Sequence, residues 1–189
     1  MGHTYPPRSD RPPSDMTWMP RHESGRWTDL PSFVLDGPDR SKEGFTVLTQ
    51  EHELEFLRYA MQGVPTTSWT PNEIDWDAYR FLSRSGPFDT TDELAAELVE
   101  VVRAHSAEEE TVVVVWSGSS SAAVAMSSRA AQENMADIEE AWIFLLDQRV
   151  LVVGDWDGYV TAARLQDLTE PIVARLRTFF EEPSDGRNL

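Results

Sequence analysis

Hydrophobic residues recur along the chain at two periods, and the change of period predicts where helices and strands lie. Apolar positions at helical spacing predict helices over residues 49–63, 90–102 and 168–180. Thr90 and Glu93 have the spacing of a capping box and precede the apolar stripe of the clearest amphipathic helix. A shorter, alanine-rich helix is expected over residues 127–137.

One further helix is predicted from a capping signature. Thr70-Pro71-Asn72-Glu73 places threonine at the cap, proline in the first helical position and glutamate three residues after the cap. The helix that follows should run through Ile74, Tyr79 and Leu82.

Strands are predicted where apolar residues are consecutive and rich in β-branched side chains. Residues 111–116 form such a run between acidic and Ser/Gly residues, as expected of a central strand buried on both faces. Residues 45–48 and 122–126 are further candidates. Three more candidates follow closely, at residues 141–146, 150–153 and 159–163.

The short connections between the last three strands determine their relative direction. Asp147-Gln148 and Asp157-Gly158 separate them, and Asp-Gly favours a two-residue type I′ turn, in which both central residues have positive φ. The strands must be antiparallel, because a parallel return needs a crossover of about a dozen residues or more. We predict an α+β domain whose antiparallel sheet contains a C-terminal three-stranded meander and is covered by about four to five helices, on one face.

Composition divides the chain near its N-terminal end. The first 44 residues hold seven of the twelve prolines, with six basic and seven acidic side chains, whereas residues 45–189 hold ten basic and twenty-six acidic ones. We predict a flexible, disordered Pro/Arg-rich tail over residues 1–30 and a single α+β domain over residues 31–189. The formal net charge of -17 therefore belongs almost entirely to the domain.

The composition also excludes several classes of protein. With no cysteine, the chain cannot form a disulfide framework, a zinc ribbon or a thiol nucleophile. No run approaches the roughly 18–20 apolar residues of a spanning helix, and residues 1–30 lack the apolar stretch of a secretory signal, so we expect a soluble cytoplasmic protein. Such acidity would repel nucleic acid and anionic membranes, and it favours a basic protein partner.

A Ser/Gly loop offers the first hint of enzyme chemistry. Gly118-Ser119-Ser120-Ser121-Ala122 nearly fits the G-x-S-x-G turn of serine hydrolases, with Ser120 as nucleophile. All four histidines precede it, and no glycine-rich oxyanion loop accompanies His52 or His105. No phosphate-binding loop motif is present either. We interpret the segment as a plain loop and expect no catalytic residue and no cofactor.

A second motif carries a resemblance to a known family. The apolar run that begins at Val150 and continues into the D-x-D-G of residues 155–158 resembles the first motif of haloacid-dehalogenase-type phosphatases. The resemblance implies Asp155 as nucleophile and Asp157 as acid and base. The 31 residues from 159 to 189 are too few for the rest of that α/β domain. We therefore interpret the motif as a hairpin whose aspartates serve the turn.

The pattern D-W-D-x-Y occurs twice, at residues 75–79 and 155–159. Each copy places an indole between two carboxylates, a composition suited to hold an arginine through charge and cation–π contact. The alternative is that Trp76 and Trp156 are core residues with solvated acidic neighbours. Because one copy falls on a predicted helix and the other in a hairpin, we expect no common geometry.

Two acidic runs lie at predicted helix–strand junctions, at Glu108-Glu109-Glu110 and Glu139-Glu140. Runs of this kind are typical of a solvated edge. Neither glutamate run has a nearby histidine or a spaced set of further ligands, so we expect no metal site there. A calcium loop at Asp155 and Asp157 would also need further oxygen ligands at fixed spacing, which the sequence lacks.

Together these features favour a binding protein over an enzyme. So large a negative charge exceeds what solubility requires and opposes folding through self-repulsion. We predict a small acidic inhibitor, comparable in function to bacterial immunity proteins and antitoxins, that occludes a basic site on a partner protein such as a toxin. The predicted partner-binding residues are Asp75, Trp76, Asp77, Glu108, Glu109, Asp155, Trp156 and Asp157. Two alternatives stay open, an enzyme with a dispersed carboxylate site and an assembly component tethered by its N-terminal tail.

Overall fold

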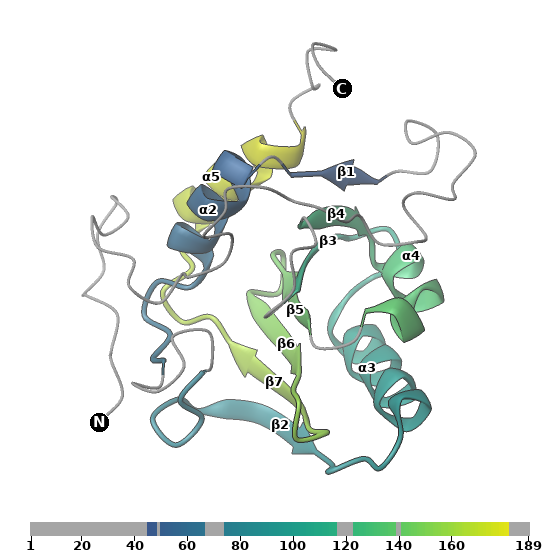
Figure 1. Ribbon diagram of the computed structural model, residues 1–189. Helices are drawn as coiled ribbons and strands as arrows, with labels where there is room; N and C mark the ends of the chain where they lie inside the picture. Colours follow the sequence, from purple (N-terminus) through teal and green to yellow (C-terminus); the bar gives the residue numbers. More distant parts are fainter. Residues whose placement is uncertain (1–44, 49, 67–73, 117–122, 139–140, 182–189) are drawn as a thin grey trace.

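The computed structural model describes residues 45–48, 50–66, 74–116, 123–138 and 141–181 (Figure 1). Its helices are α2 (Gln50–Ala60), α3 (Thr91–His105), α4 (Ser128–Glu133) and α5 (Glu170–Glu181), with a 3-10 helix, η1 (Met135–Asp137). Its strands are β1 (Thr46–Val47), β2 (Phe81–Ser85), β3 (Thr111–Trp116), β4 (Val124–Ser127), β5 (Ala141–Leu145), β6 (Val150–Gly154) and β7 (Val160–Arg164).

The strands form one seven-stranded sheet in the order β1-β4-β3-β5-β6-β7-β2. Every pairing in it is antiparallel, and β5, β6 and β7 follow one another as neighbours. The predicted mixed α+β class with an antiparallel sheet is therefore confirmed. The predicted tail over residues 1–30 lies outside the described residues, so the domain boundary stays a prediction.

Helices cover both faces of the sheet, so the expectation of a single covered face is wrong (Figure 1). α2 and α5 lie on one face, and α3 and α4 lie on the other. The reason is visible in β3, β5 and β6, whose residues are apolar in succession and buried almost throughout. A strand with no polar alternation has no face suited to water, so both of its faces need cover.

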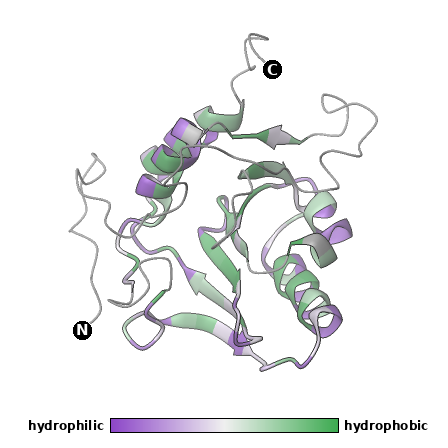
Figure 2. Cartoon of the chain, viewed as in Figure 1, coloured by the Kyte–Doolittle hydropathy of each residue, from purple (hydrophilic) through white to green (hydrophobic). Residues whose placement is uncertain are grey.

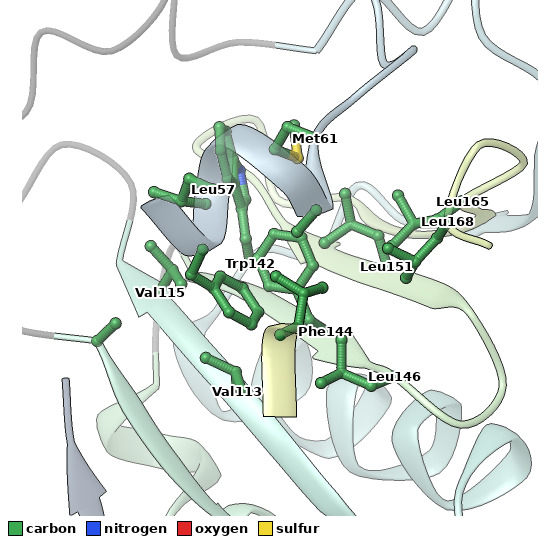
Figure 3. Close-up of a cluster of buried hydrophobic side chains, with 14 of the residues drawn as sticks. Leu57, Met61, Val113, Val115, Trp142, Phe144, Leu146, Leu151, Leu165 and Leu168 are labelled. Atoms are coloured by element: carbon green, nitrogen blue, oxygen red, sulfur yellow. The ribbon is translucent and has the colours of Figure 1, made fainter. Parts of the chain in front are cut away.

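Two separate clusters of side chains result from this arrangement. On one face, Leu57 of α2 and Met61, which directly follows the helix, pack over Trp142 and Phe144 (Figure 3). The rings of Phe56 and Phe144 meet edge-on at 5.2 Å. On the other face, α3 packs its own apolar stripe against the side chains that point the opposite way. Green apolar colour accordingly follows the strands and the inner sides of the helices in Figure 2.

The predicted helix through Ile74, Tyr79 and Leu82 is wrong. Residues 75–78 form a turn, and residues 81–85 form β2, which pairs with β7 at the margin of the sheet. The capping signature at residues 70–73 lies outside the described residues. Strand pairing with β7 outweighs local helix propensity here, because the segment has few apolar positions to anchor a helix.

The turn between β6 and β7 also differs from the predicted type I′ form. Gly158 N–H donates to the Asp155 carbonyl (3.0 Å), and Asp155 N–H donates to the Tyr159 carbonyl (3.0 Å), which closes a loop over residues 156–158. Positive φ is confined to Gly158 in this loop (φ 77°). This is the geometry of a type I turn followed by a left-handed glycine, and it places Trp156 near the apex.

The cap of α3 follows the predicted spacing with one change of partner. Thr90 Oγ1 accepts from Glu93 N–H at 3.3 Å, as expected. The Glu93 carboxylate accepts from Asp89 N–H at 3.3 Å, one residue before the cap. Within the described part of the chain, no helix combines the length and apolar character needed to cross a bilayer.

The two-sided core predicts that neighbouring residues of β5 are equally sensitive to truncation. Phe144→Ala should lower the free energy of unfolding by about 3–5 kcal/mol and Ile143→Ala by about 2–5 kcal/mol, because each empties a fully buried site on a different face. Exposed Leu82→Ala, the control, should stay within about 0.5 kcal/mol. Urea unfolding monitored by circular dichroism measures all three, and a negligible effect of Ile143→Ala would contradict the two-sided core.

Candidate functional site

The predicted partner-binding residues fall in three places and do not form one surface. Residues 75–77 lead into β2, and residues 155–157 join β6 to β7. Because β2 runs antiparallel to β7, these two turns lie at opposite ends of the pair, roughly 17 Å of strand apart. Glu108 and Glu109 precede β3, which is separated from β2 by β5, β6 and β7, a span of roughly 19 Å.

Glu108 and Glu109 share one arginine within the chain, which offsets one of their two negative charges. The Arg129 guanidinium, at the start of α4, lies 2.9 Å from Glu108 and also pairs with Glu109. Their charges raise the pKa of Arg129 above its ordinary value, with the Glu108 hydrogen bond as the largest cause. All three side chains are more than half exposed, so the group is a solvated ion-pair network, as the acidic run suggested.

The two D-W-D-x-Y copies share a turn geometry, contrary to expectation. In each, the N–H of the fourth residue donates to the carbonyl of the first aspartate, at 3.1 Å for Ala78 and 3.0 Å for Gly158. In each, the first aspartate also accepts a backbone N–H through its Oδ1. The repeated pattern is therefore a structural signature of an aspartate-capped turn.

The two tryptophans nevertheless differ completely. Trp76 is partly buried and packs against the core cluster beneath α2 and α5. Trp156 is 78% exposed. The core interpretation therefore holds for the first copy, and a surface role remains open only for the second.

Trp156 belongs to a turn that is joined to charged residues of β2, α3 and the connection between them, and we call this group the hairpin-tip site. Arg84 of β2 lies 3.7 Å from the Asp155 carboxylate and stacks over the Tyr159 ring at 4.4 Å. Glu97 of α3 accepts a 2.6 Å hydrogen bond from the Ser85 hydroxyl at the end of β2. The site comprises Arg84, Asp89, Glu93, Glu97, Asp155, Trp156 and Asp157.

Two glycines allow the segments of this site to approach one another. Phe88 N–H donates to the Gly158 carbonyl at 2.9 Å, which ties the β2–α3 connection to the β6–β7 turn. A Cβ on Gly158 would lie 2.6 Å from the Phe88 carbonyl oxygen, and a Cβ on Gly86 would lie 2.6 Å from the Gly158 oxygen. Both have positive φ. Only glycine fits such close backbone crossings without strain.

The carboxylates of the hairpin-tip site are mostly uncompensated. Within the described residues, no ion pair engages Asp89, Glu93 or Asp157, all of which are exposed. Asp155 is the exception, because it faces Arg84 and accepts from Tyr159 N–H. Partial burial still raises the pKa of Asp155 above its ordinary 3.8, although both of those contacts oppose the shift.

Sequence reasoning missed four members of this site, Arg84, Asp89, Glu93 and Glu97. The erroneous helix assignment removed Arg84 from consideration, since a strand was not expected there. The polar face of α3, which carries Glu93 and Glu97, was a usable signal, but nothing in the sequence shows that this face meets the β6–β7 turn.

The described residues do not bring together the side chains that the enzyme hypotheses require. Ser120 lies outside them, and the two histidines considered as bases lie on helices of opposite faces, His52 on α2 and His105 on α3. No group of three or more metal-ligating side chains occurs in the part of the chain that the structure describes. No known family model matches this sequence, and no curated protein matches it.

The Arg84–Asp155 contact makes a prediction about titration. Arg84→Gln removes the cation that favours ionised Asp155, so the pKa of Asp155 should rise further above 3.8. Arg103→Gln, which removes an arginine paired with Glu100 on the outer face of α3, should leave it unchanged. Carbon-detected NMR titration of the Asp155 carboxyl carbon measures both, and an unaltered pKa in Arg84→Gln would refute the contact.

The raised pKa of Asp155 in the folded chain makes stability depend on pH. Folded Asp155 holds its proton more tightly than the unfolded chain does, so its contribution is most favourable at low pH. It is lost as pH rises from 3.8 through the folded-state pKa. The free energy of unfolding of Asp155→Asn relative to the unmodified chain should therefore increase with pH across that window, as urea unfolding at several pH values can test.

Proposed function

We propose that this chain is an acidic protein-binding module that inhibits a basic partner by occluding its cationic site, in the manner of an immunity protein or antitoxin. The observation that carries the proposal is Trp156, which is 78% exposed at the apex of a hydrogen-bonded turn. Next to it in the chain stands exposed Asp157, which has no ion-pair partner among the described residues. The proposal assigns partner binding to the hairpin-tip site.

The turn supports this role because it holds the indole ready for contact. Backbone hydrogen bonds of 3.0 Å close the loop on both sides of Trp156, and Phe88 braces it from the β2–α3 connection. An anchor held on a braced turn loses little conformational entropy when it binds. Tryptophan is also among the residues that dominate binding energy at interfaces, where it fills a pocket on the partner.

The charge of the site supports a cationic partner. Asp157 follows Trp156 directly in the chain, and Asp89 and Glu93 lie on the neighbouring connection and helix end. An arginine of the partner could stack on the indole face and pair with Asp157 at once. The net charge of -17 would steer a basic protein toward the module and accelerate association, more strongly at low salt.

Inhibition by occlusion requires no catalytic or covalent step. A basic groove that serves nucleic-acid phosphates presents arginine and lysine side chains at the surface. Carboxylates of the hairpin-tip site would occupy the phosphate positions, and the bulk of the domain would exclude the substrate. Inhibition should therefore be stoichiometric, reversible and sensitive to salt.

Affinity capture tests the proposal. The purified chain, immobilised at low salt in lysate of the organism that produces it, should retain a basic protein that elutes as salt rises. The purified chain should then inhibit that protein's activity at a molar ratio near unity. Trp156→Ala should weaken binding about 30-fold or more, as loss of an interface anchor does.

The matched control is a second exposed aspartate. Asp157→Asn and Asp92→Asn remove the same charge, but Asp92 lies in the first turn of α3 outside the hairpin-tip site. Asp157→Asn should weaken binding clearly more than Asp92→Asn in calorimetric titration with the captured partner. Equal effects of the two changes, or a partner that binds Trp156→Ala as tightly as the unmodified chain, would contradict the assignment.

A further inference from the structure

β2 presents an unpaired strand edge beside the hairpin-tip site. It is the last strand of the sheet and pairs with β7 on one side, and within the described residues no strand pairs with its other side (Figure 1). Its residues 81–84 are exposed, and Phe81 and Leu82 are exposed by 42% and 48%. Such an edge offers a row of backbone donors and acceptors to an incoming extended segment.

Features of the edge argue against a second copy of this chain as its occupant. The register with β7 shifts between Phe81 and Ser83, which is a bulge at Leu82, and Arg84 lies on the same strand. Bulges and charged residues on an edge discourage self-pairing of sheets. Two copies, each with a formal net charge of -17, would also repel one another.

The two ends of the edge differ in charge. At the C-terminal end of β2, Glu97 contacts Ser85, and the turn with Asp155 and Asp157 lies alongside. Near the N-terminal end, the Asp75 carboxylate accepts backbone N–H groups of its own turn. The positive charge of exposed Arg80 offsets the negative charge of exposed Asp77 in this part of the chain. Negative charge is therefore concentrated at the C-terminal end, where Trp156 is exposed.

We infer that β2 binds an extended segment of the basic partner by antiparallel strand addition, with arginines at the N-terminal end of that segment. Every pairing in the sheet is antiparallel, and this arrangement is the more stable per residue. In it, the first residues of the segment face the acidic C-terminal end of β2. This inference rests on the proposed function and specifies what part of the partner the site recognises.

The side chains of β2 indicate the rest of the segment. Phe81 and Leu82 lie at the end away from the carboxylates, so apolar, β-branched residues are favoured in the C-terminal half of the segment. The main-chain ladder would supply affinity that is independent of sequence, and the charge gradient would set direction.

Two peptides of identical composition test the direction. Acetyl-Arg-Thr-Arg-Thr-Val-Thr-Val-amide has the predicted order, and acetyl-Val-Thr-Val-Thr-Arg-Thr-Arg-amide has it reversed. In 15N NMR titrations of the full chain, the first should bind about tenfold tighter or more and shift the amides of residues 81–85 and the Trp156 indole. Equal affinity, or shifts confined to other parts of the chain, would overturn the inference.

Backbone methylation and a charge control test the mechanism. Methylating alternate amides of the first peptide removes donors to the edge without changing its charge, so affinity should fall about tenfold or more if a ladder forms. Asp157→Asn should weaken binding of the first peptide, whereas Asp92→Asn should not. A methylated peptide that binds as well as its parent would reduce the contact to charge alone and refute strand addition.

Failure of this inference can be told apart from failure of the proposed function. If the captured partner binds through Trp156 while the amides of β2 exchange with solvent as fast in the complex as in the free chain, strand addition is wrong and the function stands. If the first peptide binds as predicted but no basic protein is captured or inhibited, the inhibitory function is wrong and the edge site stands.

Discussion

Burial of both faces of the central strands is the constraint on which the rest of the molecule depends. β3, β5 and β6 carry apolar residues in succession, so water can cover neither of their faces. α2 and α5 cover one face, and α3 covers the other with α4. With both faces occupied, the parts of the sheet itself that a partner can reach lie at its margins and ends, and β2 is one such margin.

The hairpin-tip site follows from how β2 is held at that margin. Its pairing with β7 brings Arg84 to Asp155 and Tyr159, and the glycines at positions 86 and 158 let two backbones cross closely. α3 begins a few residues after the crossing, and its Glu97 accepts a hydrogen bond from Ser85 at the end of β2. Trp156 is exposed at the apex of the braced β6–β7 turn.

Strongly patterned segments were predictable from the sequence, and the margins were not. The β-branched run of β3 and the capped stripe of α3 determine their own structure, because local and long-range preferences agree there. The same apolar runs in β5 and β6 contained the evidence for a two-sided core. β2 was missed because its pairing with β7 is a long-range contact. The two tryptophans have equivalent sequence neighbours, so only tertiary packing could separate Trp76 from Trp156.

The arginines of the described residues pair mostly with carboxylates that lie away from the hairpin-tip site. Arg129, Arg149, Arg175 and Arg177 each pair with a carboxylate away from the hairpin-tip site. Arg84 serves Asp155, while Asp89, Glu93 and Asp157 have no ion-pair partner among the described residues. Exposed pairs contribute little to stability, so their absence at the tip costs the fold little. The unpaired carboxylates therefore create a negative potential near an exposed indole and an unpaired strand edge. The cationic segment that we propose as ligand would engage all three features.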